Sequence, residues 1–344
     1  MKNTLLIHIG TPKTGTSALQ TFLADNSEKL KKQGWDFPDM LQEWEDLYGE
    51  RVVKNCIQNA VLFKWASIFN WDKSKKEKIW KLLFEHLEKN NVILSDEGIW
   101  GNPRVSTVDL INEFKSRWDN IKVVCYLRRQ DLYAEARWNQ SVKGTLEIRD
   151  VYQYISEDES LNYRKKLDDI AAIVGKENVI VRVYEKGQFE GSRGDITSDF
   201  CQACGIRDTW EGIILPGKVN ERINADVLEM NYLFNQEYKR HLDEPCYIVK
   251  RYSLKTKFGD QSCKYGYLSS DFRKEMLQKY NEDNVYIATE YMGRKDGILF
   301  KDENVDIPYY QMNFSEREKE MVKMFAEVIA ELRSYIKELK QEEN

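Results

Sequence analysis

The stretch Gly10-Thr11-Pro12-Lys13-Thr14-Gly15-Thr16-Ser17 decides the fold, because it joins an apolar run to a helix-forming segment. The run 5–9 before it predicts a buried strand, and the residues after Thr16 predict a helix. Such a loop presents backbone N–H groups at a helix N-terminus, where an anion is favoured. The spacing is that of the nucleoside triphosphate loop G-x-x-x-x-G-K-[ST], but Thr16 stands in the lysine position and the lysine lies inside the loop, at Lys13. We therefore expect a phosphate-bearing ligand other than ATP.

The six residues 12–17 resemble the 5′-phosphosulfate loop of sulfotransferases that use 3′-phosphoadenosine-5′-phosphosulfate (PAPS). The pattern of that family is P-K-[TS]-G-[TS]-[TS], and all six positions match. Three further segments are similar to the bacterial glycan-type branch of the family, in the same order along the chain: 93–97 (ILSDE), 126–131 (YLRRQD) and 178–185 (NVIVRVYE). The resemblance extends over roughly residues 4–205, with a faint echo at 284–300.

The resemblance implies a set of site residues. The donor would be bound by Pro12, Lys13, Thr14, Gly15, Thr16, Ser17 and Arg128, the last at its 3′-phosphate. Lys13 and Glu97 would be catalytic: Lys13 stabilises charge on the departing phosphate, and Glu97 accepts the proton of the acceptor hydroxyl. A sulfuryl group carries less charge than a terminal phosphoryl group, so no metal is expected.

Several alternatives stay open at these positions. The family usually has a serine where this chain has Ala136, so Arg129, Arg137 or Ser141 would have to replace its phosphate contact. The arginine pair 128–129 could instead form a structural salt bridge with Asp131 or Glu135.

The acid–base residues have alternatives as well. His8 competes with Glu97 as the base, although a histidine inside a strand is more typical of a core. Asp96 could instead cap the next segment.

The order of elements predicts an α/β fold with a P-loop-type parallel sheet flanked by helices and a mostly helical C-terminal region. Strands are expected at 4–9, 92–94, 121–127 and 179–183, and helices at 75–89, 132–142 and 163–174. We expect one domain, 1–344, in which 1–205 is the α/β core with the donor site and 206–344 is a helical part packed on it. Ligands of such sheets lie beyond the carboxyl ends of the strands.

Two regions outside the motifs are ambiguous. A capping box at Ser315-x-x-Glu318 begins a helix with a regular apolar stripe, formed by Met321, Phe325, Val328, Leu332, Ile336 and Leu339. That stripe predicts packing on the main domain, with a homodimer seam as the alternative. The aromatic-rich segment 35–70 predicts either an insertion that shapes an acceptor cleft or a satellite hydrophobic cluster. Acceptor-lining candidates are Trp100, Arg104, Trp138, Gln140 and Lys143, with packing as the alternative.

Composition narrows the function classes. A formal net charge of −5 provides no basic field for nucleic acid, and no apolar run approaches the ~18 residues of a membrane span. The N-terminus is too short and too soon interrupted for a signal peptide. The six cysteines (56, 125, 201, 204, 246 and 263) have no framework spacing, and Cys201-x-x-Cys204 predicts a buried helix face rather than a zinc or redox site. We expect a reduced, cytoplasmic protein.

The motif set favours a sulfotransferase that acts on a small-molecule hydroxyl acceptor, with a saccharide preferred. A small-molecule or nucleotide kinase is the first alternative, and the missing lysine after Gly15 counts against it. A non-catalytic phosphoadenosine-binding module is the second alternative, motivated by Ala136.

Overall fold

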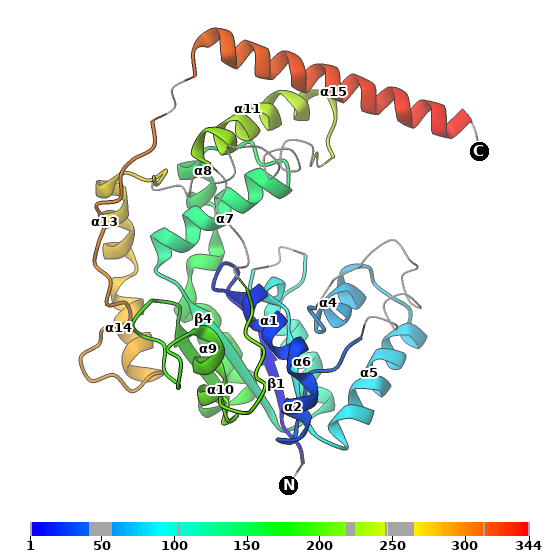
Figure 1. Cartoon of the computed structure of the whole chain (residues 1–344), viewed down its shortest axis with the longest axis vertical. Coiled ribbons are helices and arrows are strands. Elements are labelled where there is room, and N and C mark those ends of the chain that lie inside the picture. The colour runs from blue at the N-terminus through cyan, green and yellow to red at the C-terminus, as the bar shows by residue number, and fades with distance from the viewer. Residues whose placement is uncertain are drawn as a thin grey trace. The chain divides into compact units, whose positions relative to one another are not determined.

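The computed structural model describes residues 2–40, 57–101, 104–217, 224–244, 246, 265–311 and 314–342 (Figure 1). The chain forms two compact units. The first, here called the sheet unit, comprises Met1–Arg129, Glu159–Val219 and Tyr280–Glu303, and the second, the helical unit, comprises Gln130–Asp158, Asn220–Lys279 and Asn304–Asn344. These ranges differ from the division expected at residue 205, and the single domain stays a prediction.

The sheet unit is built on five parallel strands in the order β2-β3-β1-β4-β5. Their bounds are Leu5–His8 (β1), Trp35–Asp36 (β2), Asn91–Ser95 (β3), Ile121–Leu127 (β4) and Val179–Val183 (β5). The four expected strands are confirmed to within a few residues. The two-residue β2 was not predicted, because half of it is the polar Asp36.

The sheet is covered on both faces. Successive side chains of a strand point to opposite faces, and in β1 both Leu6 and its neighbours Leu5 and Ile7 are fully buried. Leu6 packs in a cluster with Phe22 of α1 (Thr16–Asp25) and Phe200 of α10 (Ile196–Ala203). Parallel strands buried in this way read as continuous apolar runs, which is why the sequence identified them.

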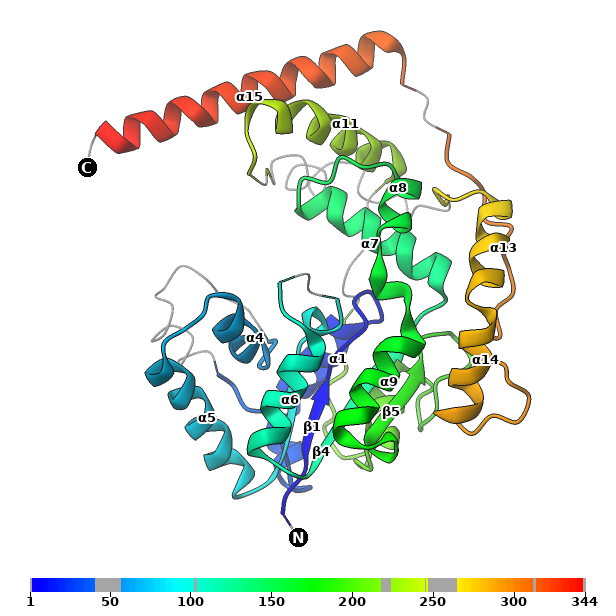
Figure 2. The ribbon, with the colours of Figure 1, turned by 180° about the vertical axis from the view of Figure 1, so that it is seen from behind.

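The other helices of the sheet unit lie between strands along the chain, except the last, which follows β5. They are α2 (Ser27–Lys31), α4 (Val61–Ile68), α5 (Lys73–Leu87), α6 (Thr107–Arg117), α9 (Tyr163–Val174) and α14 (Asn281–Glu290). Short 3-10 turns lie at Glu97–Ile99, Glu159–Leu161 and Lys176–Asn178. The helices expected at 75–89 and 163–174 correspond to α5 and α9, and the expected parallel sheet flanked by helices is confirmed (Figure 1, Figure 2).

Part of the aromatic-rich segment 35–70 belongs to a hydrophobic cluster. Phe63 of α4 lies 5.0 Å, between ring centroids, from both Trp80 of α5 and Phe114 of α6. This supports the cluster interpretation for α4, while residues 41–56 of that segment lie outside the described residues.

The helical unit contains α7 (Gln130–Gly144), α8 (Val151–Ser156), α11 (Ala225–His241), α13 (Ser270–Lys279) and α15 (Glu316–Glu342). The side-chain amides of Asn231 and Asn235 on α11 both donate to the Val142 carbonyl of α7 at 2.8 Å. Together with α14, the helices α11, α13 and α15 confirm the mostly helical C-terminal region.

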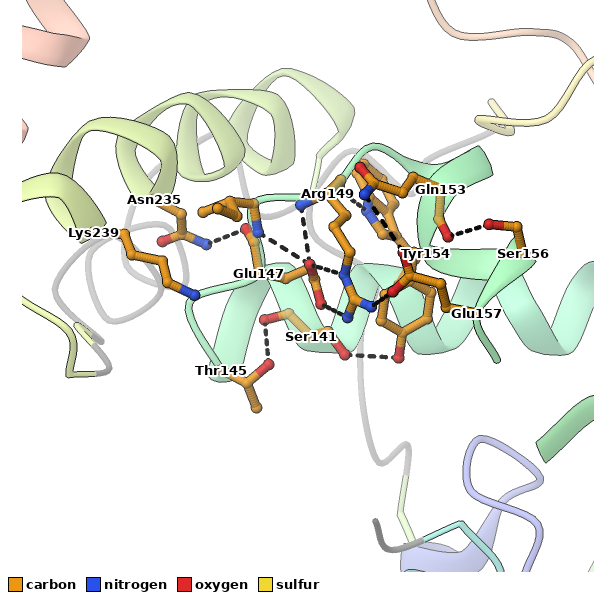
Figure 3. A network of polar contacts seen from close by, with 12 residues as sticks. Ser141, Thr145, Glu147, Arg149, Gln153, Tyr154, Ser156, Glu157, Asn235 and Lys239 are labelled. Atoms are coloured by element: carbon orange, nitrogen blue, oxygen red, sulfur yellow. Dashed lines mark hydrogen bonds and ion pairs between the residues drawn. The ribbon is translucent and has the colours of Figure 1, made fainter. Parts of the chain in front are cut away.

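A polar network fixes the loop between α7 and α8 (Figure 3). The Glu147 carboxylate accepts from the backbone N–H of Ile148 at 3.1 Å and of Arg149 at 3.0 Å. Arg149 in turn donates from Nε to Glu147 at 2.8 Å and from Nη1 to Glu157 at 2.5 Å. Glu147 and Arg149 are each held by at least two contacts, so the network orients the turn between the two helices.

The long C-terminal helix α15 begins at the predicted capping box. The Ser315 hydroxyl accepts from the Glu318 N–H at 3.3 Å, and the Glu318 carboxylate accepts from the Ser315 N–H at 2.8 Å. The helix runs beside α11, where Ala326 and Ala330 pack against Phe234 and Tyr238 (Figure 1, Figure 2).

The predicted apolar stripe of α15 is not the face that packs in the described structure. All six of its residues are exposed, whereas other residues of α15 pack against α11. The physical reason is steric. Small alanine side chains let α15 approach the α11 aromatic rings closely, and the large side chains are left on a different face. Packing of this stripe on the main domain stays a prediction.

Candidate functional site

The loop between β1 and α1 is tied to the neighbouring strand β4. The Tyr126 N–H donates to the Gly10 carbonyl at 2.6 Å, and the Thr11 N–H donates to the Tyr126 carbonyl at 3.0 Å. The Thr14 hydroxyl donates to the Thr11 carbonyl at 2.5 Å, which closes the loop internally. Thr11 and Thr14 are fully buried, and the Thr11 hydroxyl donates to the Tyr126 carbonyl of β4 at 3.0 Å, so both hydroxyls hold the loop in place.

The loop delivers its backbone to the N-terminus of α1 in a form suited to an anion. Lys13 and Gly15 have positive φ angles of 66° and 74°, and Gly15 is the N-cap residue. No described side chain caps the helix, and its first turn contains no acidic residue. The amides of a first helical turn have no carbonyl of an earlier turn to bind, and the helix dipole favours negative charge there.

Tyr184 closes one side of the loop. A Cβ placed on Gly15 would lie 3.0 Å from the Tyr184 ring and 3.1 Å from Ile196, so the glycine is needed for this approach. Tyr184 follows β5 directly and its N–H donates to the Leu127 carbonyl at 2.7 Å. Sequence reasoning gave Tyr184 no role. Its position just beyond a strand's carboxyl end was the available signal.

Arg128, the predicted donor-binding residue at the end of β4, lies against the loop. Its Nη1 donates to the Lys13 carbonyl at 3.0 Å. The Arg128 carbonyl accepts from the Tyr163 hydroxyl at 2.8 Å, which fixes the backbone at the end of β4. A second cationic side chain is therefore beside the phosphate-type loop.

Glu97 also lies against the loop. A Cβ on Gly10 would come within 3.1 Å of the Glu97 Cα and Cβ atoms. The amide of Gln20, on α1, donates to Glu97 Oε2 at 2.9 Å and to the Ser95 hydroxyl at 3.1 Å. One residue that the sequence did not single out, Gln20, thus orients the expected base.

The neighbouring Asp96 has a structural role. It is fully buried, accepts from the Gly98 N–H at 2.7 Å and forms an ion pair with Lys64 at 2.5 Å. Burial raises the pKa of Asp96, and the Lys64 ammonium opposes that rise. The expectation that Asp96 caps the following turn is confirmed, whereas its partner Lys64, far earlier in the chain, was not predictable from spacing.

His8 is a core histidine. Its ring is fully buried, its Nδ1 lies 2.8 Å from the Ser95 hydroxyl, and the rings of Tyr126 and Phe200 meet it edge-on. Burial lowers its pKa to about 3. Such a histidine is neutral at physiological pH, and Glu97 is the better candidate base of the two.

Arg129 points to a different partner from its neighbour Arg128. It is buried, donates to the Asp302 carbonyl at 2.5 Å and lies 3.8 Å from that residue's carboxylate. Asp131 and Glu135, the partners considered for it from the sequence, each bind Arg273, at 2.9 and 2.8 Å.

The other substitutes considered for the missing serine lie with Ala136 in the helical unit. Arg137 contacts the Asp158 carboxylate at 3.3 Å, and Ser141 contacts the Tyr154 hydroxyl at 3.0 Å. Both have structural partners within that unit.

Two of the acceptor-lining candidates are core residues. Trp100 is fully buried and donates to the Ser160 carbonyl at 3.1 Å. Trp138 is buried and donates to the Arg149 carbonyl at 3.0 Å. For these two, the packing alternative holds.

The described cysteines are free thiols. Cys201 lies on the buried face of α10, as predicted, and burial raises the pKa of its thiol to about 12. Cys125, Cys204 and Cys246 are likewise free, whereas residues 56 and 263 lie outside the described residues. Within the described ranges, no group of three or more His, Cys, Asp or Glu side chains is arranged to hold a metal ion, and no helix has the length and apolar character to cross a bilayer.

Comparisons with known proteins give limited similarity. No family model matches the chain. An uncharacterized protein from Archaeoglobus fulgidus is 26% identical over 197 residues, which cover 57% of this chain and 53% of that protein. The chain thus spans about half the length of this curated relative.

Two solved structures are similar at low levels. The sulfotransferase domain from the curacin biosynthetic pathway has 12% identity and a TM-score of 0.38, covering 63% of this chain and 79% of that domain. The sulfotransferase from Alicyclobacillus acidocaldarius has 11% identity and a TM-score of 0.35, covering 73% of this chain and 100% of that protein.

Proposed function

We propose that this chain is a sulfotransferase that transfers a sulfuryl group from PAPS to the hydroxyl of an acceptor. The observation that carries the proposal is the hydrogen bond from Arg128 to the carbonyl of Lys13, which joins two cationic residues at one phosphate-type loop. A donor with phosphates at both its 5′ and 3′ positions requires two such anion-binding groups. ATP lacks the 3′-phosphate, and this loop has Thr16 where an ATP-binding loop has its lysine.

The residues present fit the 5′ end of this donor. Backbone amides of the loop 12–17 and of the first turn of α1 would bind the 5′-phosphosulfate, and Lys13 would add a full positive charge. The absence of an acidic residue in that turn of α1 removes a competing charge. The buried hydroxyl of Thr14 is already bonded to Thr11, so its contribution would come from the backbone.

The proposed mechanism is an in-line transfer in which the donor, when bound, supplies an activated sulfuryl group. Glu97 accepts the proton of the acceptor hydroxyl while that oxygen forms its bond to sulfur. The bond from sulfur to the 5′-phosphate oxygen breaks, and Lys13 with the loop amides stabilises the negative charge left on that oxygen. Gln20 keeps the Glu97 carboxylate oriented through its 2.9 Å hydrogen bond. We propose that no metal takes part.

The acceptor class rests on the similarity of the motif segments to glycan sulfotransferases, and we propose a saccharide.

The free thiols at Cys125, Cys201, Cys204 and Cys246 support a reducing, cytoplasmic setting for the reaction.

An acceptor screen with ³⁵S-labelled PAPS tests this proposal, using oligosaccharides, lipids and phenols in the presence of EDTA. We expect label on a hydroxyl-bearing acceptor, with saccharides the best class, and no transfer of ³²P from γ-labelled ATP with magnesium. Transfer of ³²P without transfer of ³⁵S would establish a kinase instead. Binding of PAPS without any labelled product across the screen would favour the non-catalytic module.

A further inference from the structure

The long helix α15 exposes a continuous apolar face. Eight large apolar side chains on it have exposed fractions between 42% and 58%: Met321, Met324, Phe325, Val328, Leu332, Tyr335, Ile336 and Leu339. We call these eight residues the α15 stripe. Soluble proteins rarely leave a contiguous apolar patch above a few hundred Å² uncovered unless it binds a partner.

The spacing of the α15 stripe is that of a helix that pairs with another helix. Phe325, Leu332 and Leu339 recur every seven residues, and Met321, Val328 and Tyr335 form a second series with the same period. The two series alternate at intervals of four and three, the pattern of the a and d positions of a coiled coil. A helix that only covers a globular core has no need for so regular a repeat.

The opposite side of α15 already has a neighbour. Ala326 and Ala330 are buried against α11, and Val322 and Ile329 are partly buried at the edge of the same cluster. The α15 stripe is therefore a second, separate face of the helix, additional to the one that stabilises the helical unit.

We propose that the α15 stripe binds the α15 stripe of a second copy of this chain, with the two helices antiparallel and centred at the level of residue 330. In this register Met321 lies opposite Leu339, Phe325 opposite Tyr335, and Val328 opposite Leu332 of the other copy. The two residue numbers have the same sum in each of the three pairs, so one twofold axis relates the two members of every pair. That is the requirement for a closed, isologous dimer.

The antiparallel direction follows from the residues that flank the α15 stripe. One edge of the α15 stripe is apolar, with Val322 and Ile329 beside it and Ile336 within it, and the other edge is flanked by Glu331 and Glu338. A parallel pair would place the apolar flank of one helix against the glutamates of the other. An antiparallel pair places apolar flank against apolar flank and leaves the exposed glutamates of the two copies side by side at the solvent edge. It also opposes the two helix dipoles.

The area is sufficient for a stable dimer. If each of the eight side chains contributes on the order of 80 Å², two copies would bury about 1,300 Å², within the ~1,200–2,000 Å² of specific interfaces. The proposal is independent of the enzymatic one, since none of these residues belongs to the candidate site.

Sedimentation equilibrium of the full chain tests the pairing. We expect a dimer at about 20 μM, and we expect Phe325→Glu with Leu332→Glu to raise its dissociation constant at least ~100-fold, because both changes bury charge in the centre of the interface. The control is Ile214→Glu, which alters an equally exposed apolar side chain of the sheet unit and should leave the dimer intact. Circular dichroism confirms that each variant is folded. A monomeric wild type, or a dimer that survives the double substitution, overturns the proposal.

Cysteine cross-linking tests the register. Under mild oxidation, an equimolar mixture of the Val328→Cys and Leu332→Cys variants should form a covalent dimer above the level of wild type, whereas each variant alone should not. Efficient self-linking of Leu332→Cys would show a parallel pair and overturn the antiparallel arrangement.

Discussion

Lys13 is the residue that most clearly separates this loop from one that binds ATP. Its φ of 66° is unusual for a residue with a side chain, and its carbonyl accepts the hydrogen bond from Arg128. The backbone conformation and the neighbouring arginine together hold it at the junction of loop and helix. The sequence predicted roles for Lys13, Arg128 and Glu97 through motifs that resemble a known family, and these roles stay predictions. The contacts of Gln20 and Lys64 depend on helix packing, which spacing does not encode.

Replacing Lys13 tests its catalytic role. We expect Lys13→Ala to lower the rate of sulfuryl transfer about 10²–10³-fold, because it removes a preorganised positive charge from the departing phosphate. The measurement is the initial rate with labelled PAPS. Lys32→Ala, at an exposed position after α2, is the matched control and should retain full activity. A Lys13→Ala enzyme with more than half of the wild-type rate would contradict the assignment.

Gly15 provides a test of loop geometry. With φ at 74° and Tyr184 only 3.0 Å from where an alanine Cβ would lie, Gly15→Ala should both strain the backbone and displace the ring. We expect a loss of about 1–2 kcal/mol in the free energy of unfolding and weaker donor binding. Urea unfolding measures the first effect. Gly34→Ala, also at positive φ but with open space around it, should show the backbone cost alone and unchanged donor binding.

The buried His8 makes stability depend on pH. Its pKa in the folded state, about 3, is below its ordinary value of 6.5, so between these values the unfolded chain binds a proton that the folded chain does not. The contribution of neutral His8 to the free energy of unfolding is therefore fully present above pH 6.5. It is lost as the pH falls toward 3. Relative to His8→Gln, wild type should lose about 2 kcal/mol more between about pH 7.5 and pH 5.0 in urea unfolding. Parallel pH profiles for the two proteins would contradict this prediction.

At the scale of elements, the sequence predicted what depends on local pattern. Strands β1, β3, β4 and β5 were predictable because parallel strands buried on both faces are uninterrupted apolar runs. The capping box of α15 was also predictable, because its two partners, Ser315 and Glu318, are only three residues apart in the sequence. The packed face of α15 was not, because the choice between its alanines and its large apolar residues depends on the aromatic rings that α11 presents.

Replacing Arg273, on α13, tests how strongly its ion pairs hold α7 within the helical unit. It is fully buried and binds both Asp131 and Glu135, so Arg273→Ala removes a buried cation from beside two carboxylates. We expect a loss of about 3–5 kcal/mol in the free energy of unfolding. Arg164→Ala is the control, because its ion pairs are exposed and should contribute less than ~1 kcal/mol. Equal losses in the two variants would contradict the proposed importance of this buried cluster.

For the molecule as a whole, a net charge of −5 provides no overall field to attract the anionic donor that we propose, so a local site would have to attract it. The candidate site lies at the carboxyl ends of four parallel strands: the loop after β1, Glu97 near the end of β3, Arg128 after β4 and Tyr184 after β5. All of them belong to the sheet unit. We propose that this edge of the sheet binds a phosphoadenosine with a 3′-phosphate.

Isothermal titration calorimetry with adenosine 3′,5′-bisphosphate, in EDTA and without magnesium, tests this claim most directly. We predict binding at micromolar concentrations, at least tenfold weaker binding by Arg128→Ala, and much weaker binding of ATP with magnesium. The absence of binding to wild type at about 1 mM ligand, or tighter binding of magnesium ATP than of the bisphosphate, would contradict the account.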